Sequence, residues 1–219
     1  MEIKATMMWA TPIVEVTNPH HARLKAGLVQ CCYEMEKLSQ VAIESGVAPS
    51  LKSGLYESRF DLFRRDVPEI REFRQFCGEA LSRTVLRLHA DATGSREAPA
   101  GLTIDMFESW AHVTRDGGYH ELHSHPNCSW CGIYYLDPGD CTLNPPNGVN
   151  RFFPSTQIQY VDFGTQASVQ VPVSSAPTEG NLILFPSYVS HSAAPYRGKR
   201  DRIVLSFNAR VTATAQNAT

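Results

Sequence analysis

Apolar residues recur every three or four positions along a stretch near the start of the chain. The stripe begins at Leu24 and also includes Leu28, Val29, Cys32, Met35, Leu38, Val41 and Ala42. Asn18 and Pro19 precede it, and a capping residue followed by proline is typical of a helix N-terminus. The pattern predicts a helix from Asn18 to about Gly46 with one buried face.

A second stretch repeats this pattern after Asp66 and Pro68. Its apolar face carries Ile70, Phe73, Phe76, Cys77, Ala80, Leu81 and Leu88, and Glu and Arg residues fill the other face. The spacing predicts a helix that stops before the loop from Asp91 to Pro99. Neither helix contains a chemical motif, so we expect residues 1–100 to support a sheet from outside.

From Gly101 onward the sequence consists of short runs rich in Val, Ile, Tyr, Phe and Trp, separated by Gly- and Pro-containing turn motifs. This pattern is typical of antiparallel strands. The predicted strands are 103–114, 119–125, 129–137, 158–164, 167–173, 181–186 and 202–211. This number of strands suits a mainly β jelly roll, the cupin-like double-stranded β-helix, whose mouth can hold a small ligand.

The length of 219 residues suits one domain, 1–219. Its parts are then the helical support, the β core over 101–211 and a polar tail over 212–219. The N-terminal helices are expected to pack on the outside of the sheet.

Charge and hydropathy exclude two classes of partner. Lys and Arg number 20 against 22 Asp and Glu, so no broad positive field exists to attract nucleic acid. No run approaches the ~20 apolar residues of a membrane span, and Met1–Lys4 lacks the apolar core of a signal peptide. We therefore expect a cytoplasmic protein, with a homodimer as the working guess for its oligomeric state.

Six cysteines stand at positions 31, 32, 77, 128, 131 and 141. A chain of this size does not need disulfides for stability, so we interpret them as reduced thiols. Cys128 and Cys131 have the spacing of a redox or zinc pair, but no second CxxC exists. We favour a loop thiol at Cys128 and a barrel-lining thiol at Cys131.

Three of the eight histidines fall within six residues, at His120, His123 and His125. Alternate residues of a strand share a face, so Glu121, His123 and His125 should point one way and His120 the other. Two imidazoles on one face can bind one metal ion. His191, just past an apolar run, is the candidate third ligand, and His112 could also face inward.

Three strings in the β region carry a family resemblance. They are His123–Pro126 leading to Gly132–Leu136, then Gly180–Ser187 with His191, then Arg202–Asn208. Together they resemble the 2-oxoglutarate- and Fe(II)-dependent oxygenases, in particular a branch of bacterial and phage proteins related to prolyl hydroxylases. The likeness spans roughly residues 105–210.

The resemblance implies an iron ion held by two histidines and one carboxylate, which normally follows the first histidine by two. This sequence has His125 at that position. We favour His123, His125 and His191 as the ligands, a site one charge unit more positive than the usual one. Glu121 stays open as an alternative ligand or as an acceptor that fixes an imidazole.

The resemblance also implies residues that bind the cosubstrate. The distal carboxylate of 2-oxoglutarate needs a buried cation, and Arg202 stands eleven residues after His191, as in the family. Ser206 and Asn208 share its strand face by parity. Tyr135 matches the tyrosine that hydrogen-bonds the cosubstrate in related hydroxylases.

The implied activity is hydroxylation of an unidentified small-molecule or amino-acid-like substrate, with release of succinate and CO2. Two alternatives stay open. One is a cupin-like dioxygenase or isomerase with three histidines and no 2-oxoglutarate, against which Arg202 argues. The other is a non-catalytic jelly roll that binds a metal or a sugar. Residues 141–157 are expected to line the mouth and could select the substrate.

Overall fold

The computed structural model describes residues 10–40, 52–155, 162–163 and 171–214. These ranges contain two α-helices, one short 3-10 turn and nine strands. The helices are α1 (His21–Gln40) and α2 (Pro68–Thr93), with η1 (Leu62–Arg64) before α2. The strands are β1 (Val14–Thr17), β2 (Lys52–Glu57), β3 (Thr103–His123), β4 (Trp130–Asp137), β5 (Asn150–Phe153), β6 (Val173–Ser174), β7 (Asn181–Pro186), β8 (Ser190–Ala193) and β9 (Arg202–Thr212).

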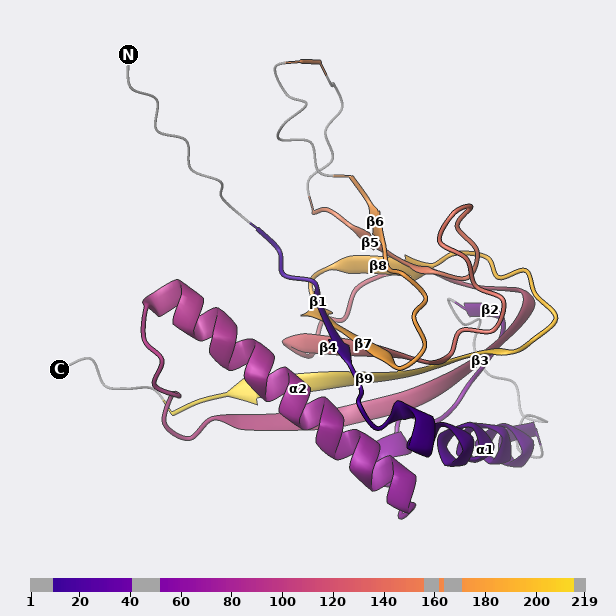
Figure 1. Cartoon of the computed structure of the whole chain (residues 1–219), viewed down its shortest axis with the longest axis horizontal. Coiled ribbons are helices and arrows are strands. Elements are labelled where there is room, and N and C mark those ends of the chain that lie inside the picture. Colours follow the sequence, from indigo (N-terminus) through magenta and orange to yellow (C-terminus); the bar gives the residue numbers. More distant parts are fainter. Residues whose placement is uncertain (1–9, 41–51, 156–161, 164–170, 215–219) are drawn as a thin grey trace.

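All strands pair antiparallel in one sheet, in the order β1-β7-β4-β9-β3-β8-β5-β6, with β2 on β3. The sheet curls, so that β8, β5 and β6 lie over β7, β4 and β9 (Figure 1). An apolar interior fills the space between the two layers: Cys131, Ile133, Tyr135, Phe152, Ile183, Phe185, Val189 and Val204. The predicted mainly β, double-stranded β-helix fold is confirmed.

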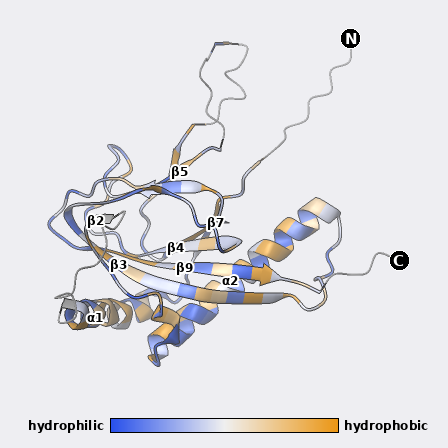
Figure 2. Ribbon diagram, turned by 180° about the vertical axis from the view of Figure 1, so that it is seen from behind, coloured by the Kyte–Doolittle hydropathy of each residue, from blue (hydrophilic) through white to orange (hydrophobic). Residues whose placement is uncertain are grey.

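Both helices pack on the outer face of the sheet, as predicted (Figure 1). Along β4, Tyr134 and Leu136 point outward beneath the helices, while Ile133 and Tyr135 point into the interior, because neighbouring side chains of a strand alternate. The ring of Phe73 on α2 lies 4.6 Å from that of Tyr134. Figure 2 shows the helices with apolar and polar positions interleaved, as one-sided burial requires.

In the described part of the chain, neither helix combines the length and the apolar character needed to cross a bilayer.

The predicted separation of 103–114 from 119–125 is wrong, because β3 is one strand of 21 residues. It pairs with β9 from Thr103 to Thr114, then with β8 at His120 and His123. Gly117 has a φ of 85°, and a Cβ on Gly118 would come within 2.4 Å of the Gly54 carbonyl oxygen. These glycines therefore let β2 approach closely at a bend and do not reverse the chain.

The remaining predicted elements fall into three groups. Strands 129–137, 181–186 and 202–211 correspond to β4, β7 and β9 within a residue. Of the predictions 158–164 and 167–173, only the last residue, Val173, lies in a described strand, and residues 158–161 and 164–170 lie outside the described ranges. The expected end of the first helix near Gly46 also lies outside them, whereas α2 runs on to Thr93.

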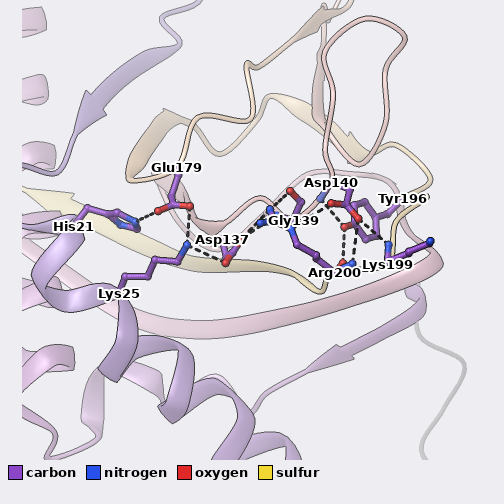
Figure 3. A network of polar contacts seen from close by, with 9 residues as sticks. All are labelled: His21, Lys25, Asp137, Gly139, Asp140, Glu179, Tyr196, Lys199 and Arg200. Carbon is purple, nitrogen blue, oxygen red and sulfur yellow. Dashed lines mark hydrogen bonds and ion pairs between the residues drawn. The ribbon is translucent and has the colours of Figure 1, made fainter.

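A polar network joins the turn after β4 to the turn before β9 (Figure 3). The Asp140 carboxylate accepts backbone N–H bonds from Lys199 at 2.7 Å and Arg200 at 3.1 Å. The Tyr196 hydroxyl accepts the backbone N–H of Asp140 at 2.8 Å and donates to the Arg200 carbonyl at 2.5 Å. The network therefore holds the segment from which Arg202 enters the barrel.

Candidate metal and cosubstrate site

Three histidines from different segments meet at one end of the barrel. His123 is the last residue of β3, and it pairs with His191 on the neighbouring strand β8. His125 lies in the loop that follows β3. One nitrogen from each ring lies within 4.8 Å of those of the other two. The backbone N–H of His125 donates to the Ser187 carbonyl at 3.1 Å, which holds the loop against the turn after β7. The arrangement could hold a metal ion.

Backbone carbonyls fix the orientation of two of these rings. His123 Nδ1 lies 2.8 Å from the Glu121 carbonyl oxygen, and His191 Nδ1 lies 3.1 Å from that of Val189. A carbonyl only accepts, so each Nδ1 carries the hydrogen and Nε2 keeps its lone pair for a metal. Both imidazoles are therefore in the tautomer that can ligate through Nε2.

The ring of His125 contacts a side-chain amide instead of a backbone carbonyl. Its Nδ1 lies 3.3 Å from the amide of Asn208, whose Nδ2 also lies 2.9 Å from Glu108 Oε2. In this orientation the Nδ2 of Asn208 faces both Glu108 and His125, and its Oδ1 faces Cys131 Sγ. Asn208 thus belongs to the support of the third histidine.

Strand parity predicted that His120 points away from the face that carries His123, and this prediction is wrong. Its ring stacks on His123 with centroids 4.0 Å apart, and it lines the same pocket as the three histidines. The pairing of β3 with β8 shifts register between His120 and His123, so alternate positions no longer share a face there. Strand parity also does not extend to His125, because β3 ends at His123.

Glu121, the alternative ligand, is exposed, and it approaches His123 through its backbone carbonyl. Its carboxylate is not part of the cluster of possible ligand atoms found in the described residues.

His191 is buried, with 5% of its surface exposed. The centroid of the His191 ring lies 4.8 Å from that of Phe185 and 6.2 Å from that of Phe152. Burial first, and then the neighbouring His123, lower the pKa of His191 to about 3. The ring is thus neutral and able to bind a metal across the physiological pH range.

Arg202 lies on the wall of the same pocket, at the start of β9. It is 3% exposed, and no carboxylate pairs with it among the described residues. Its Nη2 donates to Asn150 Oδ1 at 3.2 Å, while Arg202 Nε and Asn150 Nδ2 have no hydrogen-bond partner among the described residues. A buried cation and amide with unused donors are costly unless an anion meets them.

Tyr135 lies behind Arg202 and is not one of the described residues that line the pocket. The guanidinium carbon is 5.6 Å from the centre of its ring. Its hydroxyl pairs with Ser175 Oγ at 3.0 Å and accepts the backbone N–H of Asn150 at 3.0 Å. In this arrangement Tyr135 supports Arg202 and Asn150, whereas the family likeness suggested direct contact with the cosubstrate.

Ser206 and Asn208 line the pocket on the same strand as Arg202, in agreement with parity. Sequence reasoning assigned no role to Asn150, although its side-chain oxygen accepts a hydrogen bond from Arg202. Its signal was weak, because β5 is four residues long and follows a Pro-rich loop. His112, a minor candidate in the sequence analysis, also lines the pocket, and its Nε2 lies 2.6 Å from Glu57 Oε2.

Comparison with known families bears on this cluster. Residues 108–208 match the family model described as "Putative 2OG-Fe(II) oxygenase". This segment belongs to that oxygenase family. It contains His123, His125, His191 and Arg202. No curated protein sequence matches the chain.

Several solved structures have a similar fold. A prolyl-4-hydroxylase from Pseudomonas putida is 17% identical, with a TM-score of 0.54 over 91% of this chain and 93% of that one. The viral collagen prolyl hydroxylase of Paramecium Bursaria Chlorella virus-1, in complex with 2-oxoglutarate, is 12% identical, with a TM-score of 0.53 over 90% and 94%. HygX from Streptomyces hygroscopicus, with nickel and 2-oxoglutarate bound, is 12% identical, with a TM-score of 0.52 over 93% and 84%.

The oxygenase family uses Fe(II) and 2-oxoglutarate, and the residues present fit both. Three clustered imidazoles are suitable ligands for Fe(II). The unused donors of Arg202 and Asn150 fit a carboxylate. The pocket has about 30 Å³ of free space.

Proposed function

We propose that this Fe(II)- and 2-oxoglutarate-dependent oxygenase hydroxylates a small-molecule or amino-acid-like substrate, with release of succinate and CO2. Iron and 2-oxoglutarate, when bound, would activate O2, so that one oxygen atom enters a C–H bond of the substrate and the other enters succinate. Two structural neighbours are named prolyl hydroxylases, which supports an amino-acid-like substrate. The reaction class follows from the family match over 108–208.

In this proposal, His123, His125 and His191 hold the iron. The carbonyl groups of Glu121 and Val189 keep hydrogen on Nδ1 of two rings, so that Nε2 is free for the metal. Burial of His191 disfavours its protonated form, which removes competition between the proton and the metal.

Arg202 receives the distal carboxylate of 2-oxoglutarate. Its guanidinium can donate two parallel hydrogen bonds, and the unpartnered Nε supplies one of the donors. Asn150 Nδ2 adds a third donor at the same wall. Tyr135 acts behind them, because its ring and hydroxyl hold Arg202 and Asn150 in place.

The apolar interior below the site keeps water from its buried side. Phe185 and Val204 line the pocket next to His191 and Arg202. Low polarity strengthens the attraction between a buried guanidinium and a carboxylate, and it protects reactive groups from solvent.

The observation that carries the proposal is a buried Arg202, without a carboxylate partner among the described residues, on the same pocket wall as three clustered histidines. Anaerobic titration of Fe(II) and then 2-oxoglutarate tests it through the weak visible charge-transfer band of the chelate. Turnover with oxygen should then release succinate. Fe(II) binding without the band and without succinate would contradict the use of 2-oxoglutarate.

The three-histidine ligand set favours one alternative, a dioxygenase or isomerase that acts without 2-oxoglutarate. In that case Arg202 would bind an anionic group of the substrate itself. Oxygen consumption or isomerisation in the absence of 2-oxoglutarate would support this alternative, and strict dependence on 2-oxoglutarate would exclude it.

A further inference from the structure

Two thiols lie in contact beside the proposed metal site. Cys128 Sγ and Cys131 Sγ are 3.7 Å apart. A disulfide requires about 2.0 Å, so the two sulfur atoms must approach by roughly 1.7 Å. Cys128 is partly exposed in the loop after His125, whereas Cys131 is 2% exposed and lines the pocket. All six cysteines of the chain are described, and all are free thiols in the structure.

Hydrogen bonds hold both cysteines in this arrangement. Ser187 Oγ donates to the Cys128 carbonyl at 2.6 Å, and the backbone N–H of Ser129 donates to the Ala209 carbonyl at 3.0 Å. Cys131 lies on β4, which pairs with both β7 and β9. The loop is thus attached at two points, and only a small movement separates the dithiol from the disulfide.

The two thiols differ in their tendency to ionise. The hydrogen bond with Cys131 lowers the pKa of Cys128 against the effect of burial, and the Ser187 hydroxyl adds to this. The same contact with Cys128, together with burial, raises the pKa of Cys131. Since the thiolate is the reactive form, the more exposed Cys128 is the one that an oxidant meets first.

We propose that Cys128 and Cys131 are a peroxide-sensitive site, which closes to a disulfide and thereby lowers the affinity of the neighbouring histidines for metal. The Cys128 thiolate attacks a hydroperoxide, whose O–O bond breaks, giving a sulfenic acid and, after protonation, water or an alcohol. Cys131 sulfur then attacks Cys128 sulfur, the S–O bond breaks, and the thiol proton leaves with the oxygen as water. Two thiols are oxidised and one peroxide is reduced.

The connection to the metal site runs through Asn208. The Cys131 S–H donates to Asn208 Oδ1 at 3.4 Å, and the same amide contacts His125 Nδ1 at 3.3 Å. A disulfide has no S–H, so this bond is lost when it forms. The amide that orients His125 then loses one of its partners. This effect on the metal rests on the proposed function, whereas disulfide formation does not.

The first experiment measures the covalent change alone. Metal-free protein is treated with stoichiometric hydrogen peroxide and examined by intact mass and by non-reduced peptide mapping. We expect the loss of two hydrogen atoms, with Cys128 and Cys131 in one cross-linked peptide. The loss should be absent in Cys128→Ser and Cys131→Ser, and present in the control Cys141→Ser, another half-buried thiol, whose hydrogen-bond acceptor is the Gly148 carbonyl.

The second experiment measures Co(II) affinity before and after oxidation. We expect a loss on the order of tenfold, restored by dithiothreitol, because changes to groups that orient metal ligands have effects of this size. Cys128→Ser, which lies outside the pocket lining, should bind Co(II) normally and resist peroxide.

Three outcomes would overturn the proposal: addition of oxygen without a cross-link, a cross-link that survives in Cys128→Ser, or a disulfide that leaves Co(II) affinity unchanged. Reduced protein that fails to bind Co(II) would count against the metal site, while the mass measurement would still test the dithiol.

Discussion

Arg202 combines burial, positive charge and the absence of a paired carboxylate in the described structure. Folding such a residue costs free energy that an ordinary surface arginine does not. The neighbouring Asn150 and Tyr135 shape its site without neutralising it. Because a bound dicarboxylate would compensate this cost, the residue scale offers the most direct tests of the cosubstrate assignment.

We expect Arg202→Ala to weaken 2-oxoglutarate affinity about 100-fold, since hydrogen bonds to charged groups contribute roughly 1.5–3 kcal/mol each. Fe(II) affinity should stay close to that of the wild type. Anaerobic titrations of each ligand separate the two effects. Arg197→Ala is the matched control, because this arginine lies in the preceding turn with 72% of its side chain exposed. Unchanged 2-oxoglutarate affinity in Arg202→Ala would refute the assignment.

The choice between His125 and Glu121 can also be tested with single variants. Loss of one ligand should reduce Fe(II) affinity strongly in His125→Ala and in His191→Ala. Glu121→Gln should bind iron normally, because its carboxylate is exposed and lies outside the ligand cluster. Anaerobic Fe(II) titration measures all three. A comparable loss in Glu121→Gln would identify the carboxylate as a ligand in place of His125.

At the scale of elements, turns hold the site as much as strands do. The loop after β3 is fixed by the Ser187 carbonyl, and the turn before β9 by Asp140 and Tyr196. Lys25 of α1 extends the same network by contacts with Asp137 at 3.0 Å and Glu179 at 2.7 Å (Figure 3). The outer helix is thereby connected to the end of the barrel that carries Arg202.

The Asp140 network predicts a pH dependence of stability. Backbone N–H bonds from Arg200 and Lys199 hold the pKa of Asp140 below its ordinary value. A depressed folded-state pKa stabilises the protein above the unfolded pKa, near ~3.9, and this contribution is lost as pH falls through the folded value. Asp140→Asn should therefore lower the free energy of unfolding at pH 7 more than at pH 3, as measured by urea denaturation. An equal deficit at both pH values would show that charge is not the cause.

On the scale of the whole molecule, the three histidines come from the paired strands β3 and β8 and from the loop after β3. The unfolded chain separates His123 from His191 by 68 positions. A metal that needs both rings therefore binds the folded state in preference to the unfolded one.

This preference predicts that metal binding stabilises the fold. At a free Co(II) concentration of 100 times Kd, the gain is about 2.7 kcal/mol, and the melting temperature should rise accordingly. The rise should vanish in His123→Ala/His191→Ala and persist in Arg202→Ala. Differential scanning fluorimetry with and without Co(II) measures it, and an equal rise in the double variant would point to a different metal site.

The sequence by itself determined the fold class and supplied most of the residues proposed for the site. Apolar spacing of three to four predicted both outer helices, and strands 129–137, 181–186 and 202–211 were located within a residue. These features depend on local patterns of burial, which the chain carries directly. The histidine strings and the position of Arg202 were likewise readable without coordinates.

Only the tertiary structure decided where individual side chains point near the metal site. His120 lines the pocket because the register between β3 and β8 shifts between His120 and His123. Counting alternate residues along a strand does not predict such a bulge. Tyr135 on β4 and Asn150 on β5 are connected by a hydrogen bond from the Asn150 backbone N–H to the Tyr135 hydroxyl. Cys128 touches Cys131 because a loop folds back onto β7 and β9. Each of these contacts depends on partners distant in the sequence or on a local irregularity, which the residue pattern does not record.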